Sequence, residues 1–285
     1  MTVDGVEFAS QDFGPARIEE TDLALLAETT GLTREACLAR LGGYQLAEFS
    51  EAWKSAEMRT EAEIAAFYAG TDLYLWELFA WNTSASYVPY LARLARLAAR
   101  FPVTTHPRVL DFGSGIGTSA LTLARLGYQV TVADIPGTTF DFARARLARH
   151  GFHAAAIELA AGGGSAGSGP TLPRGAFDLI VCFDVLEHVP DPARAAQSLT
   201  RALRTGGGAA IVAAFDTQGD DWPHHLPGGY ALFGGHRWER YLDRLGLGTL
   251  GGQLYRKPGP AGRLAHRARY ELWRSTGLHV TRLPR

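Results

Sequence analysis

The sequence predicts an α/β fold, in which a doubly wound, mostly parallel sheet follows an N-terminal group of helices. Two observations support this class. After residue 105, apolar strand-like segments alternate with helical segments, as in a series of βαβ units. From residue 18 to 101, apolar residues recur in short stretches at helical spacing. We therefore expect a loose arm at 1–17, a helical cap at 18–104 and the sheet-containing core at 105–285.

The expected cap consists of several short helices. Two of them begin at Thr21 and Thr33, because threonine is a good N-capping residue. The segment 61–81 is the most aromatic part of the chain, and 86–101 repeats leucine at three-residue steps, as an amphipathic helix does. The aromatic side chains of 67–81 have two interpretations. They pack onto the core, or some of them line an apolar substrate pocket as a lid, for which we select Tyr74, Trp76 and Trp81.

The most informative segment is VLDFGSGIG at 109–117, where a strand ends in a carboxylate and runs into three alternating glycines. Glycine lets the backbone turn tightly and approach a ligand closely, and a helix beginning at 118 completes a nucleotide-type site. A dinucleotide site has the spacing G-x-G-x-x-G and needs positive potential for the pyrophosphate. Here the spacing is G-x-G-x-G, and Asp111 suits a ligand with an ammonium group. We interpret that ligand as S-adenosylmethionine (SAM), and the same features disfavour a nicotinamide dehydrogenase.

Further strands follow in the order that this interpretation requires. The strand 128–134 ends in Asp134, whose carboxylate is placed to accept hydrogen bonds from both ribose hydroxyls, although it also suits a helix cap. The strand 177–184 ends in Asp184, at the edge where open α/β sheets bind ligands, and this residue also suits a cap on the next turn. A helix at 193–203, a glycine turn at 206–208 and a strand at 209–215 complete the unit.

Residues 105 to about 245 resemble a class I SAM-dependent methyltransferase domain of the small-molecule type. The resemblance is carried by VLDFGSGIG, VTVADI, FDLIVCFDVLEHVPDP and ALRTGGGAAIV, in that order. It implies a Rossmann-like, seven-stranded sheet, SAM as cofactor and S-adenosylhomocysteine as product. The cofactor-binding residues that it implies are Asp111, Gly113, Ser114, Gly115, Gly117, Asp134, Ile135, Glu158, Phe183 and Asp184.

Three features of the resemblance carry a qualification, one in a family motif and two among these residues. The usual Lys-Pro-Gly-Gly turn of the family reads Arg204-Thr-Gly-Gly-Gly here, which keeps the turn. Glu158 is the best match to the acidic adenine contact, but a Gly/Ser-rich stretch at 162–169, interpreted as a flexible loop, follows it closely. Phe183 suits either the core or a position beside the cofactor.

Three histidines are the candidate catalytic residues. Glu187 and His188 match a pair near the active-site rim of the resembled family, and a structural capping role is equally consistent with each. The segment DDWPHH at 220–225 combines carboxylates with histidines, as a metal site does, but it lacks well-spaced zinc ligands, so no metal is expected. The preferred interpretation is that His224 or His225 faces the substrate and accepts its proton, because an unperturbed histidine has a pKa of ~6.5.

Composition excludes several other classes of protein. Hydrophobic residues make up 46% and charged residues 20% of the 285 positions, which is typical of a soluble globular enzyme. A net charge of −1 does not indicate the basic surface that nucleic-acid binding needs. The Arg-rich segment 263–274 is interpreted as a solvated helix face. The two cysteines, Cys37 and Cys182, form no disulfide or zinc pattern. No secretory signal or membrane-length apolar run is present, so we expect a cytoplasmic monomer or homodimer with no membrane partner.

The predicted function is methyl transfer from SAM to oxygen, nitrogen or an activated carbon of a small, partly apolar molecule. A composition rich in Ala, Arg, Gly and Leu is typical of a high-GC coding sequence, which fits a role in natural-product biosynthesis. The alternative is a SAM-binding protein of the same fold without methyl transfer, which acts in a cofactor-assisted rearrangement or as a partner subunit.

Overall fold

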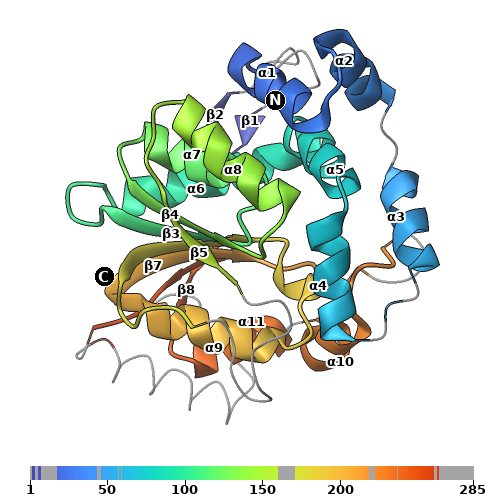
Figure 1. The fold of residues 1–285 in the computed structure, drawn as a ribbon. Coiled ribbons are helices and arrows are strands. Elements are labelled where there is room, and N and C mark those ends of the chain that lie inside the picture. The colour runs from blue at the N-terminus through green and yellow to red at the C-terminus, as the bar shows by residue number, and fades with distance from the viewer. Residues whose placement is uncertain are drawn as a thin grey trace.

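A seven-stranded sheet forms the centre of the molecule (Figure 1). The computed structural model describes residues 2–3, 6–7, 18–43, 46–56, 58, 60–159, 171–217, 222–235, 237–259 and 262. The strand order is β5-β4-β3-β6-β7-β9-β8. The strands are β3 (Arg108–Phe112), β4 (Gln129–Asp134), β5 (Ala155–Glu158), β6 (Phe177–Phe183), β7 (Leu203–Val212), β8 (Gly248–Gly251) and β9 (Leu254–Arg256). The pairs among the first five strands are parallel and β9 is antiparallel to both of its neighbours, which confirms the mostly parallel, doubly wound fold.

Helices cover both faces of this sheet. On one face lie α6 (Val88–Arg100), α7 (Thr118–Arg125) and α8 (Thr138–Arg149); on the other lie α9 (Pro192–Ala202), α10 (Pro227–Phe233) and α11 (Arg237–Arg244) (Figure 1). Successive strand residues point to opposite faces. In β3, Val109 therefore packs with α6 and α7, while Leu110 packs with α9 and α11. From β3 the chain adds β4 and β5 toward one edge of the sheet, and it then adds β6 and β7 on the other side of β3. Open α/β sheets bind ligands at the point where the strand order reverses in this way, here between β3 and β6.

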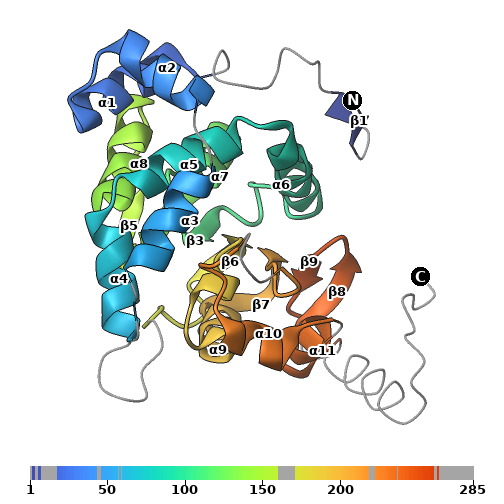
Figure 2. The same cartoon turned by 90° about the vertical axis from the view of Figure 1, so that its right-hand side faces the viewer.

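The expected helical cap is present and stands beside the core (Figure 2). It contains α1 (Glu20–Thr30), α2 (Arg34–Gly43), α3 (Leu46–Ser55), α4 (Glu61–Gly70) and α5 (Leu73–Asn82). Thr33 caps α2 as predicted, since its hydroxyl accepts a hydrogen bond from the Ala36 amide at 3.2 Å. The prediction for Thr21 is wrong, because α1 already begins at Glu20.

Two predicted segments take a more detailed form in the structure. The aromatic segment 61–81 forms two helices, because α4 and α5 are separated at Thr71 and Asp72, where Thr71 takes an extended backbone. The range 86–101 contains a 3-10 turn, η3 (Ala85–Tyr87), and then α6. Although α6 falls within the predicted cap range, its buried leucines, Leu94 and Leu97, pack in the same cluster as α7 and the sheet. This helix is therefore part of the layer that covers the sheet.

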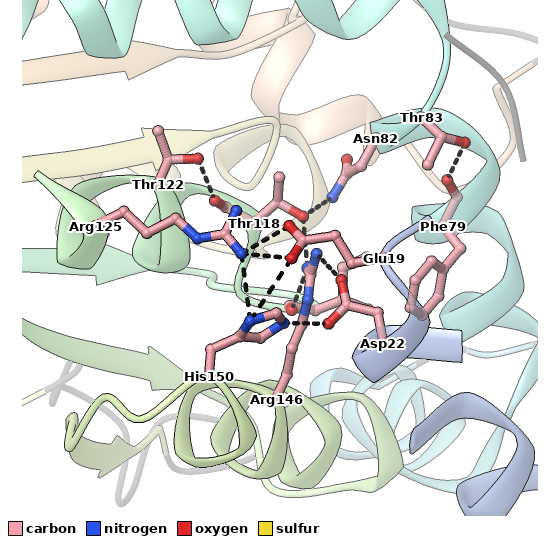
Figure 3. Close-up of polar contacts among 11 residues, drawn as sticks. Glu19, Asp22, Phe79, Asn82, Thr83, Thr118, Thr122, Arg125, Arg146 and His150 are labelled. Carbon is pink, nitrogen blue, oxygen red and sulfur yellow. Dashed lines mark hydrogen bonds and ion pairs between the residues drawn. The ribbon is translucent and has the colours of Figure 1, made fainter. Parts of the chain in front are cut away.

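A buried polar network joins the cap to the core (Figure 3). Asp22 of α1 is 2% exposed, and its carboxylate lies 2.6 Å from the Arg146 guanidinium and 2.8 Å from Nε2 of His150. Burial alone would raise the pKa of Asp22, but the hydrogen bond and charge of Arg146 hold that pKa below its ordinary value. Arg146 also donates to the Ile116 carbonyl at 3.1 Å and to the Thr118 hydroxyl at 3.0 Å. One guanidinium thus connects α1, α8 and the start of α7.

Several predictions concern segments at the margins of the structure. Within 1–17, the strands β1 (Thr2–Val3) and β2 (Val6–Glu7) pair antiparallel, so these four residues are not a loose arm. The rest of that arm, the Gly/Ser-rich stretch 162–169, Asp220, Asp221 and the Arg-rich segment 263–274 lie outside the described residues. None of the helices in the described part of the chain has the length and apolar character needed to span a bilayer.

The predicted glycine turn before the last parallel strand has a different form. The strand β7 already begins at Leu203 and runs to Val212, so the glycines at 206–208 lie inside it rather than before it. Leu203 pairs with Phe177 and Gly208 with Leu179, so the two strands are out of step between these pairs. Gly206 has a φ of 85°, which only glycine adopts readily. The expected turn is therefore a bulge within β7.

Candidate active site

Two carboxylates hold the glycine turn between β3 and α7 by accepting hydrogen bonds from backbone amides. Asp111 accepts a hydrogen bond from the Ala120 amide in the first turn of α7 at 2.9 Å. Asp134, at the end of β4, accepts from the Gly115 amide at 2.7 Å and from the Ile135 amide at 2.8 Å. Gly113 has a φ of 68°, and a Cβ at this position would overlap the Val185 side chain. The turn therefore requires glycine, for both conformation and space.

Both carboxylates have raised pKa values. Burial, together with the charge of Asp134, raises the pKa of Asp111 to about 7. The hydrogen bond from the Ala120 amide acts in the opposite direction. Burial raises the pKa of Asp134 to about 6, although its two backbone hydrogen bonds act in the opposite direction. A positively charged ligand group close to this pair would favour the ionised forms. The ammonium and sulfonium of SAM are groups of that kind.

A cavity of about 1380 Å³ opens in front of the turn, and most of the predicted site residues line it. From the core it is lined by Asp111, Gly113, Ser114, Gly115, Asp134, Ile135, Glu158, Phe183 and Asp184. From the cap it is lined by side chains of α4 and α5, which include Tyr68, Tyr74, Glu77, Leu78 and Trp81. From the loop after β7 it is lined by His224 and His225, and His188 of the short turn η4 (Leu186–His188) joins them.

Two predicted contacts do not reach this cavity. Trp76 is 1% exposed and packs with residues of α1 and α2, with the Arg40 guanidinium 5.1 Å from its ring centre. It faces away from Tyr74 and Trp81 because α5 turns by about 100° per residue. Gly117 does not line the cavity either; it has a φ of 76° and lies against Ala143 of α8. Its role is to start α7 and to allow close packing of two helices.

The remaining side chains around the turn fit SAM. Ser114 Oγ, Thr139 Oγ1 and Asp184 Oδ1 line the cavity, and each is buried without a hydrogen-bond partner among the described residues. Buried polar atoms are normally paired, so these three require partners from a ligand or water. The hydroxyl of Tyr90 acts to lower the pKa of Asp184 against the larger effect of burial, and Asp184 has a φ of 50°. Strain of this kind is common where a side chain is aimed at a ligand.

The three candidate catalytic histidines form one cluster. The rings of His188 and His224 are stacked with centroids 5.0 Å apart, and the ring of His225 lies 4.8 Å from His188 and 5.0 Å from His224. Burial lowers the pKa of His188 and of His225 to about 4, and burial with the charges of both neighbours lowers that of His224 to about 2. These values lie far below the ~6.5 on which the general-base prediction depends. The rings are neutral at pH 7 and would hold a transferred proton weakly.

Glu187 has a structural role in this region. It is 1% exposed, its Oε1 accepts a hydrogen bond from the Ala214 amide at 2.9 Å, and its carbonyl accepts from the Leu226 amide at 2.8 Å. These bonds tie η4 to the segment after β7 and to the start of α10. The amide that the Glu187 carboxylate binds belongs to a loop and not to a helix start, so Glu187 positions the histidine loop rather than capping a helix.

Sequence reasoning missed Glu77 as a cavity residue. It is the one charged residue in the apolar run LYLWELFAW of α5, and that isolation was the available signal. Its Oε2 is buried without a hydrogen-bond partner among the described residues, and burial raises its pKa to about 8. Tyr68 and Tyr90 were also missed, because α4 and α6 approach the sheet only in the folded chain.

The raised pKa of Glu77 predicts a pH-dependent stability. Between pH 4.5 and about 8 the unfolded chain releases this proton while the folded protein keeps it, so rising pH favours unfolding. We expect Glu77→Gln to stabilise the ligand-free protein progressively, by at most about 1.4 kcal/mol per pH unit across this range. Denaturant unfolding at pH 5 and pH 8 measures the gain, with Glu51→Gln on the exposed surface of α3 as the matched control. An equal effect at both pH values would contradict the prediction.

Comparison with known proteins agrees with this site. A family model described as a methyltransferase domain matches residues 85–250, which is more than half of the chain. The ubiquinone biosynthesis O-methyltransferase of Thiobacillus denitrificans is 29% identical over 202 residues, covering 70% of this chain and 80% of that protein. The enzyme of the same name from Aromatoleum aromaticum is 31% identical over 142 residues, which are 45% of this chain and only 53% of that protein. Matches to several relatives of this name span from 38% to 80% of their length, and most of these span about half or less.

One of the solved structures similar to this chain is phosphoethanolamine N-methyltransferase 2 of Haemonchus contortus in complex with SAM. It aligns with a TM-score of 0.42 and 20% identity, covering 66% of this chain and 44% of that one. The family match includes the glycine turn, the end of β4 and the turn η4, which together form the wall of the cavity. SAM is the cofactor of this family. The chain belongs to the class I SAM-dependent methyltransferases.

Proposed function

We propose that this protein transfers the methyl group of SAM to a hydroxyl oxygen of a small, partly apolar molecule. The observation that carries the proposal is one continuous cavity of about 1380 Å³, lined on one side by the cofactor motifs and on the other by aromatic side chains. The choice of oxygen is supported by the relatives, which are named O-methyltransferases. A role in natural-product biosynthesis is the finer part of the proposal and is supported by composition alone.

The cofactor supplies a methyl group on a good leaving group, so the protein contributes mainly alignment and exclusion of water. In the proposed arrangement Asp134 binds the ribose, Asp111 and Asp184 accept from the ammonium end, and Phe183 flanks the cofactor. Tyr74 and Trp81 of α5 cover the acceptor, which is apolar enough to enter a cavity with these walls. The histidine cluster lies along the same cavity and is the proposed place of the acceptor's hydroxyl group.

Incubation of the purified protein with SAM and a panel of phenols, catechols, aliphatic alcohols and amines tests the proposal. Mass spectrometry is expected to find a single methyl added to a phenol- or catechol-type compound, with formation of S-adenosylhomocysteine in equal amount. Amine or carbon methylation without any hydroxyl product would contradict the choice of oxygen. Omitting SAM, or supplying S-adenosylhomocysteine in excess, should abolish the product.

The alternative, a SAM-binding protein without methyl transfer, predicts a different result from the same samples. Calorimetry would show tight binding of SAM and of S-adenosylhomocysteine, while no compound in the panel gains a methyl group. An isomerised substrate of unchanged mass, formed only when SAM is present, would favour a cofactor-assisted rearrangement. Tight cofactor binding together with a methylated product would exclude this alternative.

A further inference from the structure

The histidine cluster has the geometry of a metal site. His188, His224 and His225 each offer one ring nitrogen, and these three atoms lie within 4.8 Å of one another. In a tetrahedral site with metal–nitrogen distances of about 2.0–2.1 Å, the nitrogens are about 3.4 Å apart. Small rotations of the three side chains would therefore be enough to close the cluster around an ion.

The partners of the other ring nitrogens are those of metal-binding histidines. Nδ1 of His188 lies 3.1 Å from the His224 carbonyl, and Nδ1 of His225 lies 2.9 Å from the Thr217 carbonyl. The Thr217 hydroxyl is also 2.8 Å from this Nδ1, but it donates its proton to the Ala214 carbonyl and so accepts from the ring. A carbonyl only accepts, so each Nδ1 carries the proton and donates it. Each Nε2 then keeps a free lone pair. Metal-ligating histidines show this arrangement, in which a backbone carbonyl fixes the tautomer and the ring orientation.

The surroundings of His224 supply an independent observation. This side chain is 3% exposed, and its Nδ1 has no hydrogen-bond partner among the described residues. The ring centroids of Phe49, Trp53 and Trp222 lie 5.2, 6.1 and 5.9 Å from the centroid of the His224 ring. Apolar side chains therefore surround a polar nitrogen. Core packing would normally pair or exclude such an atom. A bound ion accounts both for its burial and for the convergence of the three rings.

We propose that His188, His224 and His225 bind a divalent transition metal ion of the zinc class. Three imidazoles suit zinc and the neighbouring transition metals, whereas magnesium and calcium prefer oxygen ligands. This reverses the expectation from the sequence that no metal is bound. The three residues all line the cavity, so the remaining coordination position faces the space for the acceptor.

The role of this ion in catalysis rests on the proposed function. A metal beside the acceptor would polarise a hydroxyl oxygen and lower its pKa, so that the proton passes to water before or during transfer. The oxygen then forms its bond to the methyl carbon as the carbon–sulfur bond breaks, and the sulfur keeps the electron pair. On this basis the acceptor is a molecule that presents a phenol or catechol oxygen to the cluster.

Direct metal binding tests the site without reference to activity. The full chain is freed of metal with a chelator and titrated with Zn²⁺ by calorimetry and with Co²⁺ by visible absorption. We expect one ion per chain and the intense visible bands of tetrahedral cobalt. His225→Asn should weaken Zn²⁺ binding about 100-fold or more, and His224→Asn should remove the cobalt bands. The matched control is His153→Asn, an exposed histidine before β5, which should bind one ion as the parent does.

The variants also separate the possible failures. Each is first tested for S-adenosylhomocysteine binding, which reports an intact fold, and His225→Asn serves if His224→Asn does not fold. Absence of metal binding in the parent, or unchanged binding in His225→Asn, would overturn the site. Metal binding with methyl transfer that continues after chelation would overturn only its role at the acceptor. Metal binding without any methyl transfer would leave the site standing and overturn the proposed function.

Discussion

Asp134→Asn is expected to weaken S-adenosylhomocysteine binding by about 10²-fold. Each oxygen of the Asp134 carboxylate already accepts one backbone amide, from Gly115 at 2.7 Å and from Ile135 at 2.8 Å, and in the proposed complex also accepts a ribose hydroxyl. An asparagine keeps one acceptor and points its NH₂ group at the other donor. Hydrogen bonds to charged groups contribute about 1.5–3 kcal/mol each, and 1.4 kcal/mol corresponds to about tenfold in affinity.

Calorimetric titration of the variant with S-adenosylhomocysteine measures this loss. Asp141→Asn is the matched control, because that carboxylate is exposed on α8 and its change should leave affinity unaltered. In the parent protein, affinity should also fall as the pH drops through about 6, since protonation of Asp134 removes the charged acceptor. If Asp134→Asn bound the ligand with the parent's affinity, the ribose-binding role would be wrong.

Arg146→Met is expected to destabilise the protein by about 3–5 kcal/mol, because it removes the guanidinium paired with the buried Asp22 carboxylate and leaves only the His150 ring of the two partners shown. Asp22 is 2% exposed, and Arg146 is the cation bonded to it at 2.6 Å (Figure 3). The same change releases the Ile116 carbonyl and the Thr118 hydroxyl beside the glycine turn. We therefore expect cofactor affinity to fall together with stability.

Denaturant unfolding and S-adenosylhomocysteine titration check both effects. Arg149→Met, three residues further along α8, removes an exposed pair with Glu28 and should change stability little. The double variant Asp22→Asn/Arg146→Met removes both charges, so it should be more stable than Arg146→Met alone. If Arg146→Met were as stable as the parent, the cap would not be anchored through this ion pair.

Local features of the sequence predicted the elements of the core. The strands ending at Phe112, Asp134 and Phe183 were recognised because buried parallel strands are nearly continuous apolar runs, and a turn with glycine at every second position is unmistakable. The cap was less predictable. A single aromatic run covers 61–81, but the helix breaks at Thr71 and Asp72, directly after Gly70 at the end of α4, and the aromatic pattern does not show this break.

Some site residues could likewise be predicted from the sequence, and others could not. Asp111, Asp134 and Asp184 all line the cavity because the ends of parallel strands meet at one edge of a sheet, and their cofactor-binding roles stay predictions. Trp76 was misplaced because composition does not reveal which side of α5 faces the cavity. Glu77 and Tyr90 escaped notice for the same reason, since their helices meet the sheet only after folding.

The amino-acid sequence was enough to predict the fold class, the cofactor and the residues that hold the glycine turn, because these depend on short motifs whose partners are a few positions apart or at strand ends. The character of the histidine cluster, in contrast, emerges from the folded chain. His188 lies 36 positions from His224 in the chain, yet their rings are stacked at 5.0 Å in a buried aromatic setting. Burial lowers the pKa values of these rings, and the fold brings one nitrogen of each ring within 4.8 Å of the others; neither effect can be read from residue types alone.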